Sequence, residues 1–198
     1  NNTGISAAAT INVIPVNDAP LKGGDYAGAL NEGAVYVLNS DLAHLDLNST
    51  DIDNANGTLK YILTSVPNAT TEGTLFRDTN GNNLVDTGEA LIATADTSTV
   101  AKINAISTSG YFTQAEVDAK QIKYAHSGQN PDGTDTFGFK VVDGMADYPF
   151  ADIATNQAGT VTLTITEVDD PATGLPVVRG TMTPGSVLTA NVSGIADA

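Results

Sequence analysis

DTFGFKVVDG, at residues 135–144, decides the fold that we expect for this chain, because its apolar and polar residues alternate. A second stretch, TVTLTIT at residues 160–166, alternates in the same way and carries threonine at every polar position. The apolar positions are Phe137, Phe139 and Val141 in the first stretch and Val161, Leu163 and Ile165 in the second. A period of two predicts strands that are buried on one face only. Both stretches therefore indicate a β-sheet with a polar outer face.

The rest of the chain is also typical of an all-β protein, with one or two short helices. Further β-rich runs occupy residues 34–38, 59–63, 122–125, 176–180 and 186–192. One short helix is expected after Thr113, because Thr113 and Glu116 have the spacing of a capping box. A second helical turn is expected over residues 40–45, with a serine as its cap.

An internal repeat sets the domain boundaries that we predict. TINVIPVNDAP at residues 10–20 matches TLTITEVDDP at residues 162–171, with Val16 and Val168 aligned. Each copy is an alternating strand followed by a short acidic linker, which is typical of the last strand of a module in a tandem array. The repeat predicts the last strand of a preceding module at residues 1–17, a complete module at 18–170 and the first strands of a following immunoglobulin-like module at 171–198.

The charge of the chain excludes several classes of partner. The 198 residues include 8 Lys and Arg against 23 Asp and Glu, for a net charge of −15, and there is no cysteine. Binding to nucleic acid requires clustered basic residues, so we expect no nucleic acid partner. No apolar run is long enough to cross a bilayer, so we expect no membrane insertion. Of the 23 acids, 18 are Asp, a residue that favours turns and also binds calcium.

The strongest local motif is DTNGNNLVDTGE at residues 78–89, which has the ligand spacing of an EF-hand calcium loop. The predicted ligands are Asp78, Asn80, Asn82, Leu84 through its backbone carbonyl, Asp86 and Glu89. The loop departs from the EF-hand pattern at its sixth position, where Asn83 replaces glycine, although asparagine tolerates the left-handed conformation required there. The alternative interpretation is a polar loop between two strands that binds no metal.

Three segments in order resemble the chondroitin sulphate proteoglycan core-protein repeat, a relative of the cadherin β-sandwich. They are YFTQAEVD at residues 111–118, IKYAH at residues 122–126 and DTFGFKVVDG at residues 135–144. The resemblance covers about residues 20–168 and implies a cadherin/immunoglobulin-like β-sandwich. The linker VNDAP at residues 16–20 is similar to those of giant bacterial surface proteins and repeats-in-toxin adhesins, which stack many cadherin-like modules.

The same resemblance implies calcium at the junctions between modules, where it stiffens the linker. Asn17 and Asp18 would share calcium with Asp51 and Asp53, whose Asp-x-Asp spacing places both carboxylates on one side of an extended turn. At the opposite end of the module, Asp169 and Asp170 would pair with Glu32. The alternative is that these acids cap turns and bind no metal.

We therefore expect a calcium-stabilised structural and adhesive module of a large tandem-repeat protein, extracellular or on a bacterial cell surface, that supports cell adhesion or biofilm formation. Its partners would be neighbouring modules of the same chain. A module that binds carbohydrate or peptide is the alternative, and the Asn-x-Thr sequons at Asn48, Asn56 and Asn68 leave a eukaryotic matrix protein open. We expect no enzyme, because His44 and His126 stand apart and no catalytic motif surrounds them.

Overall fold

The computed structural model describes residues 9–14, 17–39, 45–128, 133–143, 157–169 and 171–196. Asp170, His44 and most of the helical turn predicted over residues 40–45 lie outside these ranges. The strands are β1 (Ala27–Asn31), β2 (Val35–Val37), β3 (Lys60–Ser65), β4 (Gly73–Arg77), β5 (Tyr111–Thr113), β6 (Ile122–His126), β7 (Thr134–Val142), β8 (Ala158–Thr166), β9 (Val177–Arg179) and β10 (Thr189–Asn191). The helices are α1 (Val100–Asn104) and α2 (Gln114–Asp118), with 3-10 turns η1 (Asn56–Thr58) and η2 (Thr108–Gly110).

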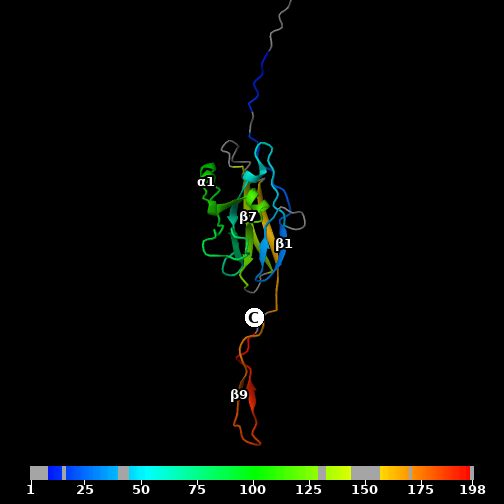
Figure 1. Ribbon diagram of the computed structural model, residues 1–198, viewed down its shortest axis with the longest axis vertical. Coiled ribbons are helices and arrows are strands. Elements are labelled where there is room, and N and C mark those ends of the chain that lie inside the picture. Colours follow the sequence, from blue (N-terminus) through cyan, green and yellow to red (C-terminus); the bar gives the residue numbers. More distant parts are fainter. Residues whose placement is uncertain are drawn as a thin grey trace, which may run out of the picture.

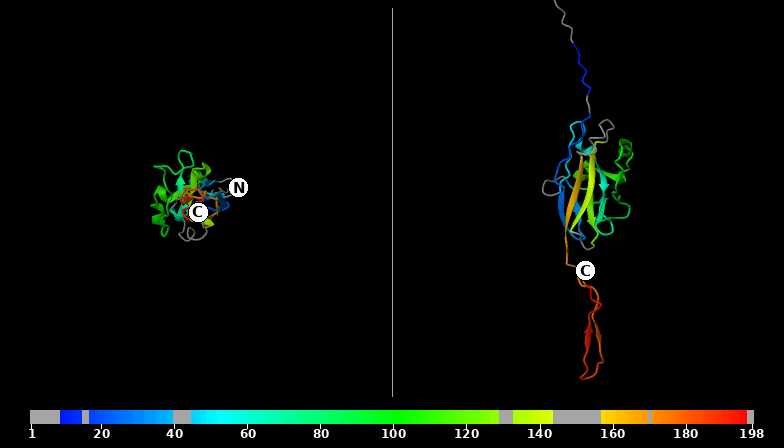
Figure 2. Two further views of the ribbon diagram at one scale, coloured as in Figure 1. Left: turned by 90° about the horizontal axis from the view of Figure 1, so that it is seen from below. Right: turned by 180° about the vertical axis from the view of Figure 1, so that it is seen from behind.

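Two sheets pack face to face, which confirms the predicted all-β sandwich (Figures 1 and 2). The larger sheet has the strand order β1-β8-β7-β3-β5 and the smaller one has the order β2-β6-β4. All pairs within these two sheets are antiparallel except β1 with β8, which run parallel. The parallel pair brings the first strand of the sandwich beside its last strand.

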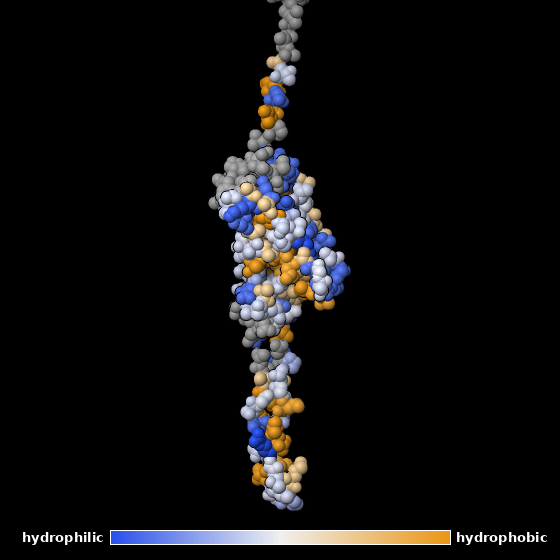
Figure 3. Space-filling model, turned by 90° about the vertical axis from the view of Figure 1, so that its left-hand side faces the viewer, coloured by the Kyte–Doolittle hydropathy of each residue, from blue (hydrophilic) through white to orange (hydrophobic). Residues whose placement is uncertain are grey.

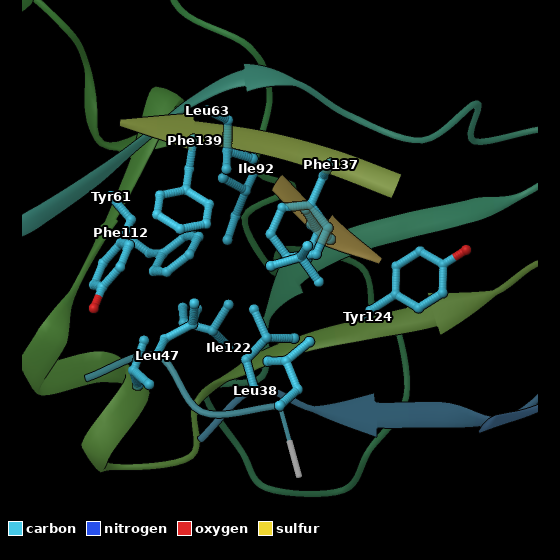
Figure 4. Close-up of a cluster of buried hydrophobic side chains, with 14 of the residues drawn as sticks. Leu38, Leu47, Tyr61, Leu63, Ile92, Phe112, Ile122, Tyr124, Phe137 and Phe139 are labelled. Atoms are coloured by element: carbon cyan, nitrogen blue, oxygen red, sulfur yellow. The ribbon is translucent and has the colours of Figure 1, made fainter. Parts of the chain in front are cut away.

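The core lies between the sheets and is built by the alternating strands. All six apolar residues of the two deciding stretches are buried, whereas Thr136, Thr160 and Thr164 face solvent. Figure 4 shows aromatic rings from the larger sheet pointing toward aliphatic side chains of the opposite layer. The ring of Phe139 lies 5.3 Å from that of Tyr26 and 5.4 Å from that of Tyr61, both in edge-on geometry. The core therefore combines apolar burial with preferred aromatic contacts.

Helix α2 confirms the predicted capping box. The Thr113 side chain accepts a hydrogen bond from the backbone N–H of Glu116, and the Glu116 carboxylate accepts one from the backbone N–H of Thr113. Helix α1 was not predicted, and its N-cap is Thr99, whose side chain accepts a hydrogen bond from the backbone N–H of Lys102. Five residues give too few positions for a helical period to stand out in the sequence. Strand β4 was also not predicted, because it contains no alternating run.

Two terminal segments leave the sandwich from opposite ends (Figure 1). At the N-terminal side, residues 9–14 extend away from the sandwich and form no strand. At the other side, β9 and β10 lie within the two β-rich runs expected there, and they pair with each other in an antiparallel hairpin that was not predicted. Both segments expose apolar side chains, which Figure 3 shows in orange. The domain boundaries themselves stay predictions.

Candidate metal sites

The loop at residues 78–89 begins directly after β4 and folds around the carboxylate of Asp78. One oxygen of this carboxylate, Oδ1, accepts a hydrogen bond from the backbone N–H of Gly81 at 2.5 Å, and Oδ2 accepts one from that of Asn83 at 2.9 Å. Asn83 has a φ of 61°, the left-handed conformation that the sequence predicted for this position. The first predicted ligand is therefore oriented by the backbone of its own loop.

The remaining predicted side-chain ligands converge on the same loop. Asp86 Oδ2 accepts hydrogen bonds from the side-chain amides of Asn80, at 2.9 Å, and Asn82, at 2.6 Å. The Glu89 carboxylate accepts from the backbone N–H of Asp86 at 3.3 Å. Hydrogen bonds thus join Asn80, Asn82 and Glu89 to Asp86, whereas Asp78 is bonded to the backbone of Gly81 and Asn83 in the same loop. Leu84 is 60% exposed, and its role as a ligand through its backbone carbonyl stays a prediction.

Lys123 was not predicted at this loop, and it changes the electrostatics there. Its ammonium donates hydrogen bonds to Asp78 Oδ2 and to Asn83 Oδ1, and its side chain is only 6% exposed. The hydrogen bond from Lys123 is the main cause that lowers the pKa of Asp78 to about 2. Register explains the contact, because β6 pairs with β4 and places Lys123 opposite Phe76, two residues before Asp78. Any cation bound by Asp78 would share that carboxylate with a buried ammonium.

The predicted linker site is also brought together. The backbone N–H of Asp18 donates to Asp53 Oδ2 at 2.7 Å. Asp51 Oδ1 accepts from the backbone N–H groups of Asp53 and Asn54, both at 2.8 Å. Asn54 in turn donates its side-chain amide to Asn17 Oδ1 at 3.3 Å. All four of Asn17, Asp18, Asp51 and Asp53 therefore meet at one end of the sandwich.

Two residues join this cluster that sequence reasoning had not assigned to it. Asp143, directly after β7, accepts a hydrogen bond from the side-chain amide of Asn17 at 2.7 Å. Asn54 contacts both the linker and Asp51. Asp51 Oδ2 is buried and has no hydrogen-bond partner. A buried carboxylate oxygen without a donor is costly, and a cation at this point would satisfy it. We call the set Asn17, Asp18, Asp51, Asp53, Asn54 and Asp143 the linker cluster.

Residues 90–166 match a family model described as cadherin-like. This cadherin-like region covers less than half of the chain and runs from the end of the 78–89 loop through α2 and β6 to β8. The match supports a cadherin-like fold and leaves the more specific resemblance to the proteoglycan repeat as a prediction. No curated protein matches the chain.

The second predicted junction lies at the end of the cadherin-like region. Glu32 follows β1, and its Oε2 lies 3.5 Å from the backbone nitrogen of Val168, which donates to it. Glu32 is therefore close to the linker that follows β8. Asp169 is exposed on that linker, and Asp170 lies outside the described residues. The pairing of these two aspartates with Glu32 around calcium stays a prediction.

The oxygen atoms of the 78–89 loop and of the linker cluster fit calcium, which prefers six to eight oxygen ligands. Within the described ranges, no set of three or more His, Cys, Asp and Glu side chains lies close enough to hold a metal ion. Each candidate site therefore depends on asparagine and backbone oxygens as well as carboxylates. The buried, unpartnered Asp51 Oδ2 makes the linker cluster the better fit, whereas Lys123 opposes binding at the loop.

A hollow of about 380 Å³ lies next to Arg77, and no residue of either candidate metal site lines it. Its lining residues are Arg77, Ala90, Thr108, Tyr111, Thr113 and Glu116. The Arg77 Nε donates to Glu116 Oε1 at 2.7 Å, and Nη2 donates to the backbone carbonyl of Tyr111. Burial opposes ionisation of Glu116, but the bonds from Arg77 and Thr113 outweigh it and lower the pKa of Glu116. The remaining guanidinium nitrogen, Nη1, has no partner.

Within the described residues, no helix has the length and apolar character needed to cross a bilayer.

His126, the one histidine described, has a structural role. Its Nδ1 accepts backbone hydrogen bonds from Gly33 at 3.0 Å and Gly128 at 3.1 Å. It therefore ties the turn between β1 and β2 to the segment after β6.

Proposed function

We propose that residues 18–170 form a calcium-stabilised structural and adhesive module of a large tandem-repeat protein, secreted or displayed on a cell surface. The observation that carries the proposal is the linker cluster. In it, a segment outside the sandwich, Asn17 and Asp18, is bonded to Asp53 and Asp143 at the end of the sandwich beside the unpartnered Asp51 Oδ2. Such a contact couples the orientation of the linker to the module.

The chemistry of the linker cluster supports a mechanical role. Asp51, Asp53 and Asp143 bring like charges to one end of the sandwich, and this repulsion favours loosening of the linker. Bound calcium would supply the opposing positive charge and a common centre for these oxygens. Asn17 would contribute its amide oxygen, which lies within the cluster and accepts a hydrogen bond from the side-chain amide of Asn54. A linker held in this way would let an array of modules project a distal region from the cell, which suits adhesion or biofilm formation.

The module boundaries belong to the same proposal. The sandwich from β1 to β8 is the complete module, residues 1–17 are the last strand of a preceding one, and residues 171–198 open a following one. The sequence repeat supports this order, since the strand before the first linker matches β8, the strand before the second. Neighbouring modules of the same chain are therefore the proposed partners.

Calcium is expected to raise the melting temperature of the protein by about 3–6 °C. Extracellular calcium modules bind with dissociation constants of about 0.1–1 mM. At a calcium concentration about tenfold above that constant, one site adds about 1.4 kcal/mol to the free energy of unfolding, which corresponds to this shift for a chain of this length. Differential scanning calorimetry with calcium and with EDTA measures the shift.

Variants separate the two candidate sites. Asp51→Ala removes the central carboxylate of the linker cluster, and Asp78→Ala with Glu89→Ala removes two ligands of the loop. Each is expected to lose the part of the calcium response that its site provides. Asp25→Asn is the matched control, because it removes one negative charge outside both sites and keeps the oxygen that accepts from the backbone N–H of Ala27. An identical melting curve of the unchanged protein with calcium and with EDTA would refute the calcium proposal.

The hollow beside Arg77 favours a second candidate function, the binding of a carboxylate-bearing sugar or peptide. Arg77 Nη1 is a donor without a partner, and Lys60 Nζ lies 4.7 Å from the centre of the Tyr111 ring. Arg77 thus lines the hollow, and Lys60 contacts Tyr111, another of its lining residues. A rearrangement of the Arg77 side chain that uncovers Nη1 would present an arginine fork to a carboxylate.

Glucuronate is expected to shift the NMR signals of Tyr111 and Thr113, whereas glucose at the same concentration leaves them unchanged. The positive charge at the hollow is the reason for this selectivity. Lys60→Gln is expected to weaken the glucuronate shifts, and Lys102→Gln, which removes the same charge beside Asp96, should not. Equal shifts with both sugars would remove this candidate.

A further inference from the structure

A buried polar network joins helix α2 to the chain segment that precedes Asp51. Gln114, the first residue of α2, donates its side-chain amide to the backbone carbonyl of Leu47 at 2.7 Å, and its Oε1 accepts from the backbone N–H of Ser49 at 3.0 Å. The hydroxyl of Tyr61, on β3, donates to the same Oε1 at 2.5 Å and lies 2.8 Å from Ser49 Oγ. Gln114, Ser49 and Tyr61 are all buried. The network therefore holds the backbone of residues 47–49 from inside the sandwich.

The amide of Gln114 uses all of its hydrogen-bonding capacity. A glutamine amide can donate two hydrogen bonds and accept two. Besides its bond to Leu47, Nε2 donates to Asp118 Oδ1 at 2.8 Å within the helix, and Oε1 has its two donors in Ser49 and Tyr61. A buried network in which every group is satisfied specifies one arrangement of the segments that it joins. Removal of the amide would leave the buried groups around it without that partner.

Helix α2 also holds the chain on the other side of Asp51. The backbone N–H of Asp51 donates to Oδ1 of Asn56 at 3.1 Å, and Asn56 is the first residue of η1. The 3-10 turn η1 packs against α2, and the backbone N–H of Gln114 donates to the carbonyl of Leu59, directly after η1, at 2.9 Å. Asp51 therefore lies between two chain segments that are both fixed to α2.

The opposite edge of the same segment is bonded to the linker. Thr50 and Leu21 exchange two backbone hydrogen bonds, at 2.7 and 2.9 Å, and the backbone N–H of Asn48 donates to the carbonyl of Gly23 at 3.2 Å. Residues 47–50 thus form a layer between α2 and the residues that follow Asp18. A shift of this layer would move Asp51 relative to Asp18, and with it the oxygens of the linker cluster.

We propose that Gln114 is a positioning residue that sets the calcium affinity of the linker cluster, because it holds the segment that carries Asp51 and Asp53. Gln114 is bonded to Leu47 and Ser49 and not to the candidate ligands, so its effect passes through the backbone. Removal of groups that orient metal ligands commonly weakens metal binding by about 10–100-fold. The inference rests on the proposed calcium function, since it assigns a role at the same site.

Gln114→Met tests the proposal, because methionine keeps the length of the side chain and removes the amide. Calcium is titrated into the full chain, and binding is followed by the backbone NMR signals of Asp53 and Asn54, which report on the linker cluster and not on the 78–89 loop. The dissociation constant is expected to rise about tenfold or more. The melting temperature in EDTA is measured alongside, so that a loss of stability is separated from a loss of affinity.

Two further variants complete the test. Tyr61→Phe removes one donor to Gln114 and leaves the amide in place, so it should weaken calcium binding less than Gln114→Met does. It also keeps the proposal testable if Gln114→Met does not fold. Tyr124→Phe is the matched control, because it removes a buried hydroxyl that donates to Asp135, and neither residue belongs to the linker cluster or to the network of Gln114. Tyr124→Phe should leave the dissociation constant unchanged.

Hydrogen exchange in EDTA tests the positioning without calcium. The backbone N–H groups of Asp53 and Asn54 donate to Asp51 Oδ1. They should exchange about threefold faster or more in Gln114→Met than in Tyr124→Phe, because the segment before them opens more often.

The possible outcomes separate this inference from the calcium function itself. If Gln114→Met lowers the melting temperature but leaves both the dissociation constant and the exchange rates unchanged, Gln114 supports the fold alone and the proposal is overturned. Equal weakening of calcium binding in Tyr124→Phe would overturn it as well. If the signals of Asp53 and Asn54 in the unsubstituted protein do not respond to calcium, the calcium function is refuted together with the effect on affinity, and the exchange rates alone decide whether Gln114 positions Asp51.

Discussion

Phe139→Ala is expected to lower the free energy of unfolding by about 4 kcal/mol, the largest effect of any substitution considered for this module. Phe139 is fully buried and contacts the rings of Tyr26 and Tyr61. Truncation removes apolar burial and leaves a cavity between the two sheets, which together cost about 3–5 kcal/mol for phenylalanine. The melting temperature should fall by about 8–16 °C, as measured by calorimetry or by circular dichroism.

The control for this substitution lies on the outer face of the same sheet. Thr164→Ala changes an exposed residue of β8 and should alter the free energy of unfolding by less than about 0.5 kcal/mol. Gly159→Ala probes the same contact from the other side, because a Cβ there would meet the ring of Phe139. Combining it with Phe139→Leu should recover part of the loss caused by Gly159→Ala. Equal effects of Phe139→Ala and Thr164→Ala would contradict the arrangement of the core.

Local patterns explain which parts of the fold could be predicted. The alternation in β7 and β8 and the capping box of α2 are fixed by neighbouring residues, and the structure confirms them. β4 reads GTLFR and has buried residues on both faces, so its sequence has no alternation. Its strand character comes from pairing with β6. α1 depends on one capping threonine and five residues, too short a signal to stand out.

The candidate sites also combine local contacts, which could be predicted, with long-range contacts, which could not. The spacing within residues 78–89 is local, so the converging side chains of that loop could be predicted. Asp143 and Asn17 are 126 residues apart, and their contact depends on where β7 ends relative to the linker. Lys123 reaches Asp78 only through the register of β6 against β4. Long-range pairing of strands therefore supplied the residues that sequence spacing could not.

Lys123→Met is expected to make the protein less stable without calcium and to strengthen calcium binding at the 78–89 loop by about tenfold or more. Methionine keeps the apolar part of the side chain and removes the ammonium that donates to Asp78. Without it, the pKa of Asp78 should rise from about 2 toward the ordinary value of 3.8. Because this pKa is depressed in the folded state, its contribution to stability is present above about pH 4 and is lost as pH falls toward 2.

The two effects have opposite signs, which makes the substitution informative. The buried carboxylate of Asp78 loses its partner cation, so the melting temperature in EDTA should fall. The same loss removes a positive charge from the place where calcium would bind, so the rise in melting temperature on adding calcium should be larger than in the unchanged protein. Lys102→Met, which removes the same charge from an exposed pair with Asp96, should leave the calcium response as it is. If Lys123→Met lowers stability equally with calcium and with EDTA, Asp78 forms an ion pair with Lys123 and does not bind calcium. The linker cluster is then the one remaining candidate site of the two.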